Sequence, residues 1–124
     1  MNVVAQVFVA LAGVFHVVVF AMESVLFRKP STYRRFLVKD AEVEVARPWA
    51  FNQGFYNLFL AIGALGGLIW GGDKGHAIAL FACACMAGAG VVLLASDRRM
   101  ARAAATQAVP PIIALVLAAI LQLT

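Results

Sequence analysis

Apolar residues run through the chain in four long stretches that polar segments separate. These stretches extend from Val3 to Phe27, Trp49 to Trp70, His76 to Ser96 and Ala108 to Leu123. A helix of about 20 mostly apolar residues crosses the hydrocarbon core of a bilayer, and the stretches are close to that length. We therefore predict an all-α fold, with residues 1–124 forming one four-span membrane domain packed as an up-down-up-down four-helix bundle.

The polar segments between these stretches differ in length and character. Residues 28–48 form the only sizeable polar loop, and the part from Lys39 to Arg47 mixes both signs of charge, so it could form a short interfacial helix. Arg34, Arg35 and Phe36 could seat on anionic lipid headgroups; the alternative is an ordinary solvated loop. Residues 71–75 read as a tight turn, and residues 97–107 as a short basic link. Pro110 and Pro111 fit the first turn of the last helix.

Composition supports a membrane protein. Of the 124 residues, 64% are hydrophobic and only 13% are charged, and the mean hydropathy is +0.92. A soluble domain has about half apolar and a quarter charged residues, so soluble domains, disorder and nucleic-acid modules are excluded. The first stretch has no basic residue before it, so we read it as a retained helix and not as a signal peptide.

Basic residues set the predicted orientation. The formal net charge is +4, and nine of the ten Lys and Arg residues lie in residues 28–48 and 97–107. Positive loops face the cytoplasm, so we expect both of these loops inside and both termini outside. We expect a bacterial inner-membrane protein whose partner is the lipid bilayer, with no nucleic-acid partner.

Polar side chains inside a span are costly, so each one is a candidate for a site. Glu23 lies about 6 Å of helix rise before the cytoplasmic end of the first stretch. Asn52 and Gln53 enter the second stretch at the same level. Asn52 shares a helix face with Tyr56, and Gln53 shares the adjacent strip with Asn57. This concentration of polar groups predicts a binding role, and the alternative is hydrogen bonding between helices.

Two further residues belong to this polar set. His16 shares a face with Glu23 at about 10 Å of rise, and Gln107 flanks the cytoplasmic side of the last stretch. Glu23 could act as a proton carrier, an acid/base or a cation site, or it could only pair with Arg28 or Arg34 or bond to Asn52. His16 could instead be a hydrogen-bonded core histidine. No third ligand stands at a fixed spacing, so we predict no metal, and no cofactor motif is present.

The cysteines and glycines of the apolar stretches are expected to serve helix packing. Cys83 and Cys85 are about 200° apart around a helix, so we expect them to be packing residues that do not bond to each other. Gly63 and Gly67 form a small-x-x-x-small pattern that predicts close helix packing, or a homo-oligomer through this face. The same small residues could instead leave room for a ligand beside His16. His76 is expected to be exposed and inert at the outer interface.

The run Asn52-Gln53-Gly54-Phe55-Tyr56-Asn57, followed by Leu58-Phe59-Leu60-Ala61, resembles the signature of a small bacterial membrane family, domain of unknown function one-three-zero-four. His16, the pair Met22-Glu23, and Gln107-Ala108-Val109-Pro110 are similar to other positions of that family. The resemblance covers nearly the whole chain. It implies a four-helix membrane protein and carries no established activity.

Several functions fit these residues. The first is binding of a small amphiphile or lipid in a polar pocket between the first two helices, toward the cytoplasmic leaflet. The second is a small membrane enzyme of the proton-transfer or isomerase type, with Glu23 and His16 as acid and base. The others are a proton-coupled transporter and a helix-packing partner of another protein. The residues expected to bind the ligand are Asn52, Gln53, Tyr56, Asn57 and Gln107.

Overall fold

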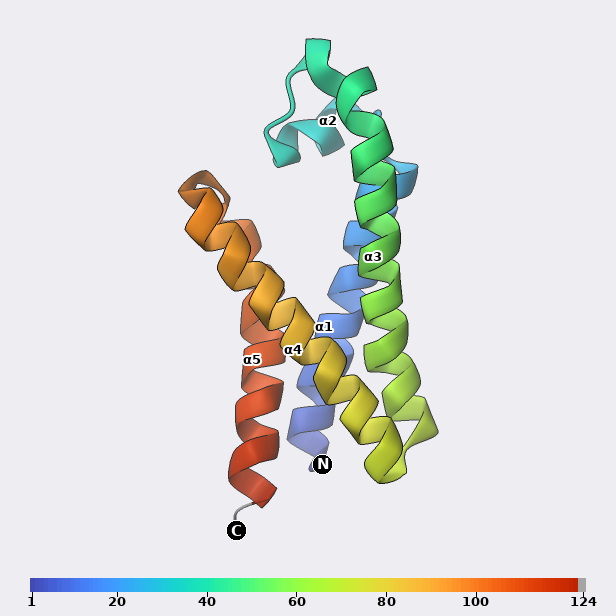
Figure 1. Cartoon of the computed structure of the whole chain (residues 1–124), viewed down its shortest axis with the longest axis vertical. Coiled ribbons are helices and arrows are strands. Elements are labelled where there is room, and N and C mark those ends of the chain that lie inside the picture. Colours follow the sequence, from blue (N-terminus) through green and yellow to red (C-terminus); the bar gives the residue numbers. More distant parts are fainter. Residues whose placement is uncertain (123–124) are drawn as a thin grey trace. The chain divides into compact units, whose positions relative to one another are not determined.

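The computed structural model describes residues 1–122 and the side chains as far as Leu121, and it is helical throughout (Figure 1). Short 3-10 turns occupy Arg34–Phe36, Asp40–Glu42 and Arg98–Met100. The regular elements are α1 (Val3–Phe20), a π-helical turn (Ala21–Val25), α2 (Pro30–Tyr33), α3 (Val43–Trp70), α4 (Gly72–Ser96) and α5 (Ala101–Gln122).

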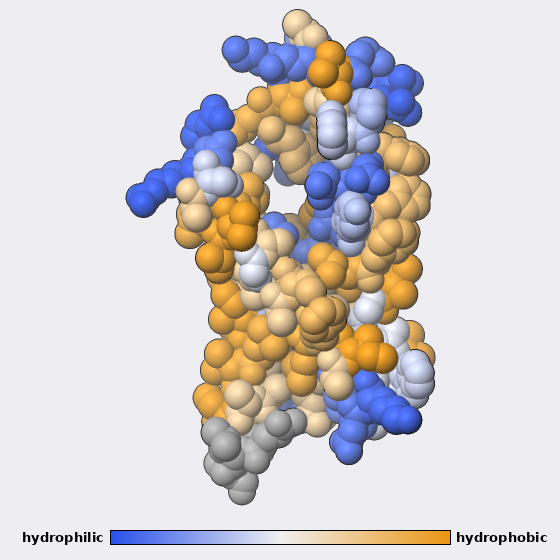
Figure 2. Space-filling model, in the orientation of Figure 1, coloured by the Kyte–Doolittle hydropathy of each residue, from blue (hydrophilic) through white to orange (hydrophobic). Residues whose placement is uncertain are grey.

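Four helices are long and apolar enough to cross a membrane, by length and composition. The apolar stretches comprise Val3–Val25, Asp40–Trp70, Gly72–Ser96 and Arg98–Leu121. This confirms the predicted all-α membrane fold, and these are the features of a multi-pass membrane protein. In Figure 2, apolar residues cover the middle of the visible face of α4 and α5, and hydrophilic residues gather near the ends of these helices.

Several predicted helix boundaries were wrong. Helix α3 begins at Val43 and not at Trp49, so half of the supposed interfacial segment is the start of a spanning helix. The turn before α4 needs only Gly71, because glycine there and at the next position adopts positive φ angles of 74° and 64°. The link at 97–107 is mostly helical: Asp97 caps the turn at Arg98–Met100, and α5 follows.

The same extension moves the two prolines into the interior of α5. The alanine-rich start of α5 has a high helix propensity, which favours helix before the prolines are reached. The predicted end of the last span at residue 123 lies outside the described residues. The first span also differs at its end, because the α-helix stops at Phe20 and a π turn continues to Val25, where Leu26 N donates to Ala21 O at 2.8 Å.

The chain divides into two compact units. Unit 1 comprises residues 1–15 and 60–122, and unit 2 comprises His16–Phe59. Within unit 1, all four long helices contribute to one core. Its buried members are mostly small side chains: Val9, Ala12, Ala64, Ala79, Ala82, Cys83, Met86 and Ala114. Small side chains let the helix backbones approach closely, as is common in membranes.

Two glycines of α3 in unit 1, Gly63 and Gly67, face α4. A Cβ placed on Gly67 would lie 2.5 Å from the carbonyl oxygen of Gly75 and 2.7 Å from the nitrogen of Ala79, and one placed on Gly63 would lie 3.2 Å from the Cβ of Ala82. The expectation of close helix packing is therefore confirmed. The Gly63/Gly67 face is occupied within the chain, so a homo-oligomer through this face would first have to displace α4.

Unit 2 contains a second, smaller core in the polar segment and the start of α3. Phe27, Tyr33, Val43 and Ala50 are buried there. The hydroxyl of Tyr33 donates to Asp40 Oδ1 at 2.6 Å. This bond holds the proton on the phenol and raises the pKa of Tyr33 above its ordinary value. The polar segment is thus a folded cap and not an irregular solvated loop.

Candidate functional site

The end of α1 and the first half of α3 run antiparallel in unit 2, and three contacts fix their register. The hydroxyl of Ser24 donates to the carbonyl oxygen of Phe51 at 2.8 Å. The side-chain nitrogen of Asn57 donates to Glu23 Oε1 at 2.6 Å. The rings of Phe20 and Phe55 meet edge to face with centroids 5.2 Å apart. This register brings the acidic residue of the first span to the polar run of the second.

Gly54 allows this close approach. A Cβ placed on Gly54 would overlap Ser24 Oγ, and it would lie 3.0 Å from both the Cβ and the backbone nitrogen of Ser24. No other residue type leaves this space, because glycine alone lacks a Cβ. The glycine inside the Asn-Gln-Gly run therefore positions Ser24 and Glu23 against α3. We had not assigned it this role from the sequence.

Glu23 and Asn57 form the central polar pair. Both side chains are partly buried, and both residues lie in membrane-spanning stretches. The two amide hydrogens of Asn57 are used, because Nδ2 also donates to the carbonyl oxygen of Gln53 at 3.1 Å. The carboxyl oxygen Oε2 of Glu23 and the amide oxygen of Asn57 keep lone pairs that these bonds do not use. The pair consequently offers acceptors to a ligand that donates.

Glu23 lies inside the π-helical turn at Ala21–Val25. A π turn inserts an extra residue into a helix, rotates the following side chains and is frequent at functional sites. Here it places Glu23 and Ser24, two consecutive residues, both in contact with α3.

The other polar residues of α3 are exposed. Asn52, Gln53 and Tyr56 lie on the outer surface of the helix, and Tyr56 is 57% exposed. At 100° per residue they form a strip that continues from Asn57 around the helix. The prediction that Asn52 and Gln53 lie level with Glu23 holds to within about one turn, but the residue in contact with Glu23 is Asn57.

An aromatic row runs beside this polar strip. Phe51, Phe55 and Phe59 follow one another along α3, with ring centroids 5.1 Å and 6.3 Å apart. Tyr56 meets Phe59 edge to face. The same helix therefore presents an amide-rich strip and an aromatic strip next to each other.

Two further residues were predicted for the site, His16 and Gln107. His16 is fully buried and already takes part in an interaction, as a core histidine would. Gln107 lies in α5, which belongs to unit 1, and is partly buried. Within unit 2 the structure thus joins Glu23 to Asn57 directly.

The arginines considered as partners for Glu23 bind other acids. Arg28 Nε lies 3.5 Å from Glu44 Oε1, and Arg34 donates to both carboxyl oxygens of Asp40 at 3.0 and 3.1 Å. The alternative that Glu23 forms an ion pair with Arg28 or Arg34 was therefore wrong. The hydrogen bond to Asn52 was also wrong, since Asn57 provides it.

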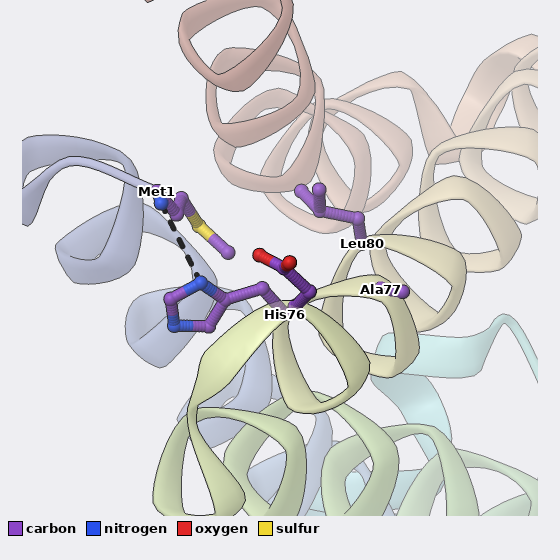
Figure 3. Close-up of a pocket in the computed structure, with 5 residues that line it drawn as sticks. Met1, His76, Ala77 and Leu80 are labelled. Atoms are coloured by element: carbon purple, nitrogen blue, oxygen red, sulfur yellow. Dashed lines mark hydrogen bonds between the residues drawn. The ribbon is translucent and has the colours of Figure 1, made fainter. Parts of the chain in front are cut away.

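Unit 1 contains a small cavity that the sequence did not suggest. It has a volume of about 230 Å³ and is lined by Met1, Asp73, His76, Ala77 and Leu80. The terminal ammonium of Met1 lies 3.4 Å from Nδ1 of His76, as Figure 3 shows. His76 was expected to be exposed, but it is half-buried. Only its neighbour Asp73, three residues earlier on the same helix, could have signalled a polar site.

Metal-binding side chains do not gather in the described residues. Among residues 1–122, no group of three His, Cys, Asp or Glu could hold a metal ion. Cys83 and Cys85 are both free, and only Cys83 is fully buried. The expectation that the two thiols face different sides of α4 is confirmed by this difference in exposure.

The fold and the polar pair define a class: a small multi-pass helical membrane protein with an acid–amide pair inside its spanning helices. A family model described as "Protein of unknown function (DUF1304)" matches residues 10–119, so the chain belongs to this family. No curated protein and no solved structure matches the chain.

Proposed function

We propose that unit 2 binds the polar head of a small amphiphile or lipid at Glu23 and Asn57. The observation that carries the proposal is the 2.6 Å bond between these two side chains inside spanning helices. Polar groups in a membrane are expensive and usually serve a function or pair with one another. Here Glu23 Oε2 and the amide oxygen of Asn57 keep lone pairs that the bonds between the helices do not use, and helix packing alone does not need such acceptors.

The free acceptors define the ligand's chemistry. Glu23 Oε2 and the amide oxygen of Asn57 accept hydrogen bonds, so the matching headgroup donates them through hydroxyl or ammonium groups. The exposed amides of Asn52 and Gln53 and the hydroxyl of Tyr56 extend the polar surface outward along α3. A headgroup could approach along this strip from the bilayer.

The aromatic row supports an amphiphile over a water-soluble ligand. Phe55 and Phe59 lie beside the polar strip, and Phe59 is 59% exposed. Aromatic rings offer a large apolar contact area. Phe59 adjoins Asn52 and Tyr56 at the exposed edge of the strip, so an alkyl chain or ring system could lie there while its polar groups bond along the strip.

The test is native mass spectrometry of protein purified in mild detergent. The wild type should carry a discrete extra mass, and Glu23→Gln and Asn57→Ala should each lose it. Glu44→Gln is the matched control, because Glu44 lies in the same unit but is 75% exposed and pairs with Arg28. This variant should keep the extra mass.

Each outcome bears on the proposal directly. An extra mass that survives both Glu23→Gln and Asn57→Ala would place the ligand elsewhere and refute the proposed site. A second outcome would also refute the proposal: the wild type carries no discrete extra mass, even after addition of a long-chain amino alcohol as a probe. The pair of Glu23 and Asn57 would then serve only as a contact between helices.

The cellular setting is part of the proposal. The charge asymmetry of the chain supports a bacterial inner membrane, with the cap of unit 2 in the cytoplasm and both termini outside. Glu23 and Asn57 would then lie near the cytoplasmic leaflet. Cysteine labelling from either side of intact spheroplasts, at Ser31→Cys and at Asp73→Cys, would test the orientation: only Asp73→Cys should react from outside.

A further inference from the structure

The folded cap of unit 2, residues 28–47, carries an excess of positive charge. It contains six Lys and Arg residues against Asp40, Glu42 and Glu44. Figure 2 shows hydrophilic residues gathered at the end of the unit that holds α2 and the start of α3. These cations differ in whether an acidic side chain of the cap already pairs with them.

Two of these cations, Arg34 and Arg28, stabilise the cap itself. Phe36, which was considered for lipid contact, does so too. Arg34 forms the bidentate pair with Asp40, and its guanidinium lies 5.9 Å from the ring centroid of Tyr33. Arg28 pairs with Glu44. Phe36 packs against the small core of the unit. Arg34 and Phe36 were predicted to contact lipid headgroups, but both side chains stabilise the fold of the cap.

The side chains of four other cations form no ion pair within the described part of the chain: Lys29, Arg35, Lys39 and Arg47. Lys29, Arg35 and Lys39 are exposed, and Arg47 is half-buried. Charged side chains of this kind interact strongly only with a partner that supplies the opposite charge.

Two of these cations, Lys29 and Arg47, stand where exposed apolar surface ends. Val25 is 68% exposed, and Lys29 follows it by four residues; Trp49 is 73% exposed, and Arg47 precedes it by two. Exposed tryptophan marks the interface level in membrane proteins. Lys and Arg at helix ends extend their charges toward the same level, where lipid phosphates lie.

We infer that the cap is a docking surface for anionic lipid headgroups, contacted by Lys29, Arg35 and Arg47. This surface is distinct from the polar pair of Glu23 and Asn57, which offers acceptors and suits a donating headgroup. The two sites therefore recognise different features of a headgroup, its donors at one and its charge at the other. Each juxtamembrane cation contributes about fivefold to binding of an anionic surface, so removing three should weaken it by well over tenfold.

The experiment uses Trp49 as the reporter. The chain has two tryptophans, so Trp70→Phe leaves Trp49 as the only one. In non-ionic micelles, energy transfer from Trp49 to phosphatidylglycerol with a fluorescent acyl chain is titrated and compared with phosphatidylcholine carrying the same chain. We expect tighter binding of phosphatidylglycerol, and the preference should disappear in the Lys29→Gln/Arg35→Gln/Arg47→Gln variant.

One control separates charge from folding. Lys29→Arg/Arg35→Lys/Arg47→Lys keeps the charges and should keep the preference. If the triple variant does not fold, Arg35→Gln alone changes one exposed side chain and should weaken binding about fivefold. An equal affinity of wild type for both lipids would overturn the inference. So would full competition by inorganic phosphate at matched ionic strength, because the site would then recognise phosphate and not a lipid surface.

Discussion

Replacing Gly54 by alanine perturbs the contact that joins α1 to α3 in unit 2. The added methyl group would overlap Ser24 Oγ and approach the backbone nitrogen of Ser24 to 3.0 Å. The hydroxyl can rotate away, but it then loses its bond to the carbonyl oxygen of Phe51. The backbone contact can be relieved only by moving the two helices apart. That movement would also lengthen the bond between Glu23 and Asn57.

The expected cost follows from three contributions. Loss of the Ser24 hydrogen bond costs about 1 kcal/mol. Overpacking of a tight contact costs about 1–3 kcal/mol. Alanine gains up to about 1 kcal/mol over glycine in helix propensity, which offsets part of the loss. We expect Gly54→Ala to reduce the free energy of unfolding by about 1–3 kcal/mol.

Thermal unfolding in mild detergent measures this effect, and the midpoint should fall by about 4 °C per kcal/mol. Gly66→Ala is the matched control, because Gly66 lies in the same helix and a Cβ there would meet nothing within 4 Å. It should be neutral or slightly stabilising. Ser24→Ala combined with Gly54→Ala removes the overlapping hydroxyl and should recover part of the lost stability.

Two results would refute this reasoning. If Gly54→Ala and Gly66→Ala shift the midpoint equally, the close approach of Ser24 has no energetic consequence. If Ser24→Ala fails to recover any stability in the Gly54→Ala background, the cost arises from another contact. In either case the register of α1 against α3 would have to be revised.

Three further predictions concern packing, ionisation and exposure. Gly67→Ala places a methyl group 2.5 Å from the backbone of α4, so it should lower the unfolding midpoint far more than Gly88→Ala, which meets nothing within 4 Å; equal midpoints would contradict the packing of α3 on α4. Absorbance near 295 nm should show the phenol of Tyr33 titrating above its ordinary pKa because of Asp40. The contribution of this phenol to stability is therefore present below its unfolded pKa and is lost as the pH rises through the higher folded pKa. Asp40→Asn should return the titration of Tyr33 toward its ordinary pKa. N-ethylmaleimide should modify Cys85 faster than the buried Cys83 in folded protein, judged with Cys83→Ala and Cys85→Ala variants; the reverse order would contradict the orientation of α4.

The sequence predicted the membrane helices well because the bilayer imposes a simple rule. A long apolar stretch must form hydrogen bonds within itself, so length and hydropathy alone identify a helix. Helix ends were predicted less well, because they depend on caps and propensity and not on the bilayer. Val43 and Gly72 begin their helices before the apolar stretch does, and α5 includes residues that had been read as a link.

The candidate site was predicted in part. The polar residues of α3 and Glu23 stood out because charge and amides are rare in spanning helices. Their pairing was not predicted correctly, because it depends on the register of the first spanning helix against α3, which no sequence pattern marks. The role of Gly54 was missed for a similar reason: a glycine shows its purpose only when the atom that fills its empty space is known.

The sequence by itself determined that this is a helical membrane protein, which segments can span, and which polar side chains must be accounted for inside them. The tertiary structure decided that Asn57 and not Asn52 meets Glu23, that Arg34 stabilises the cap through Asp40, and that Gly67 packs on α4. The physical reason is the range of the forces. Hydropathy acts residue by residue along the chain, whereas hydrogen bonds and close packing depend on register, which a shift of a few residues changes completely.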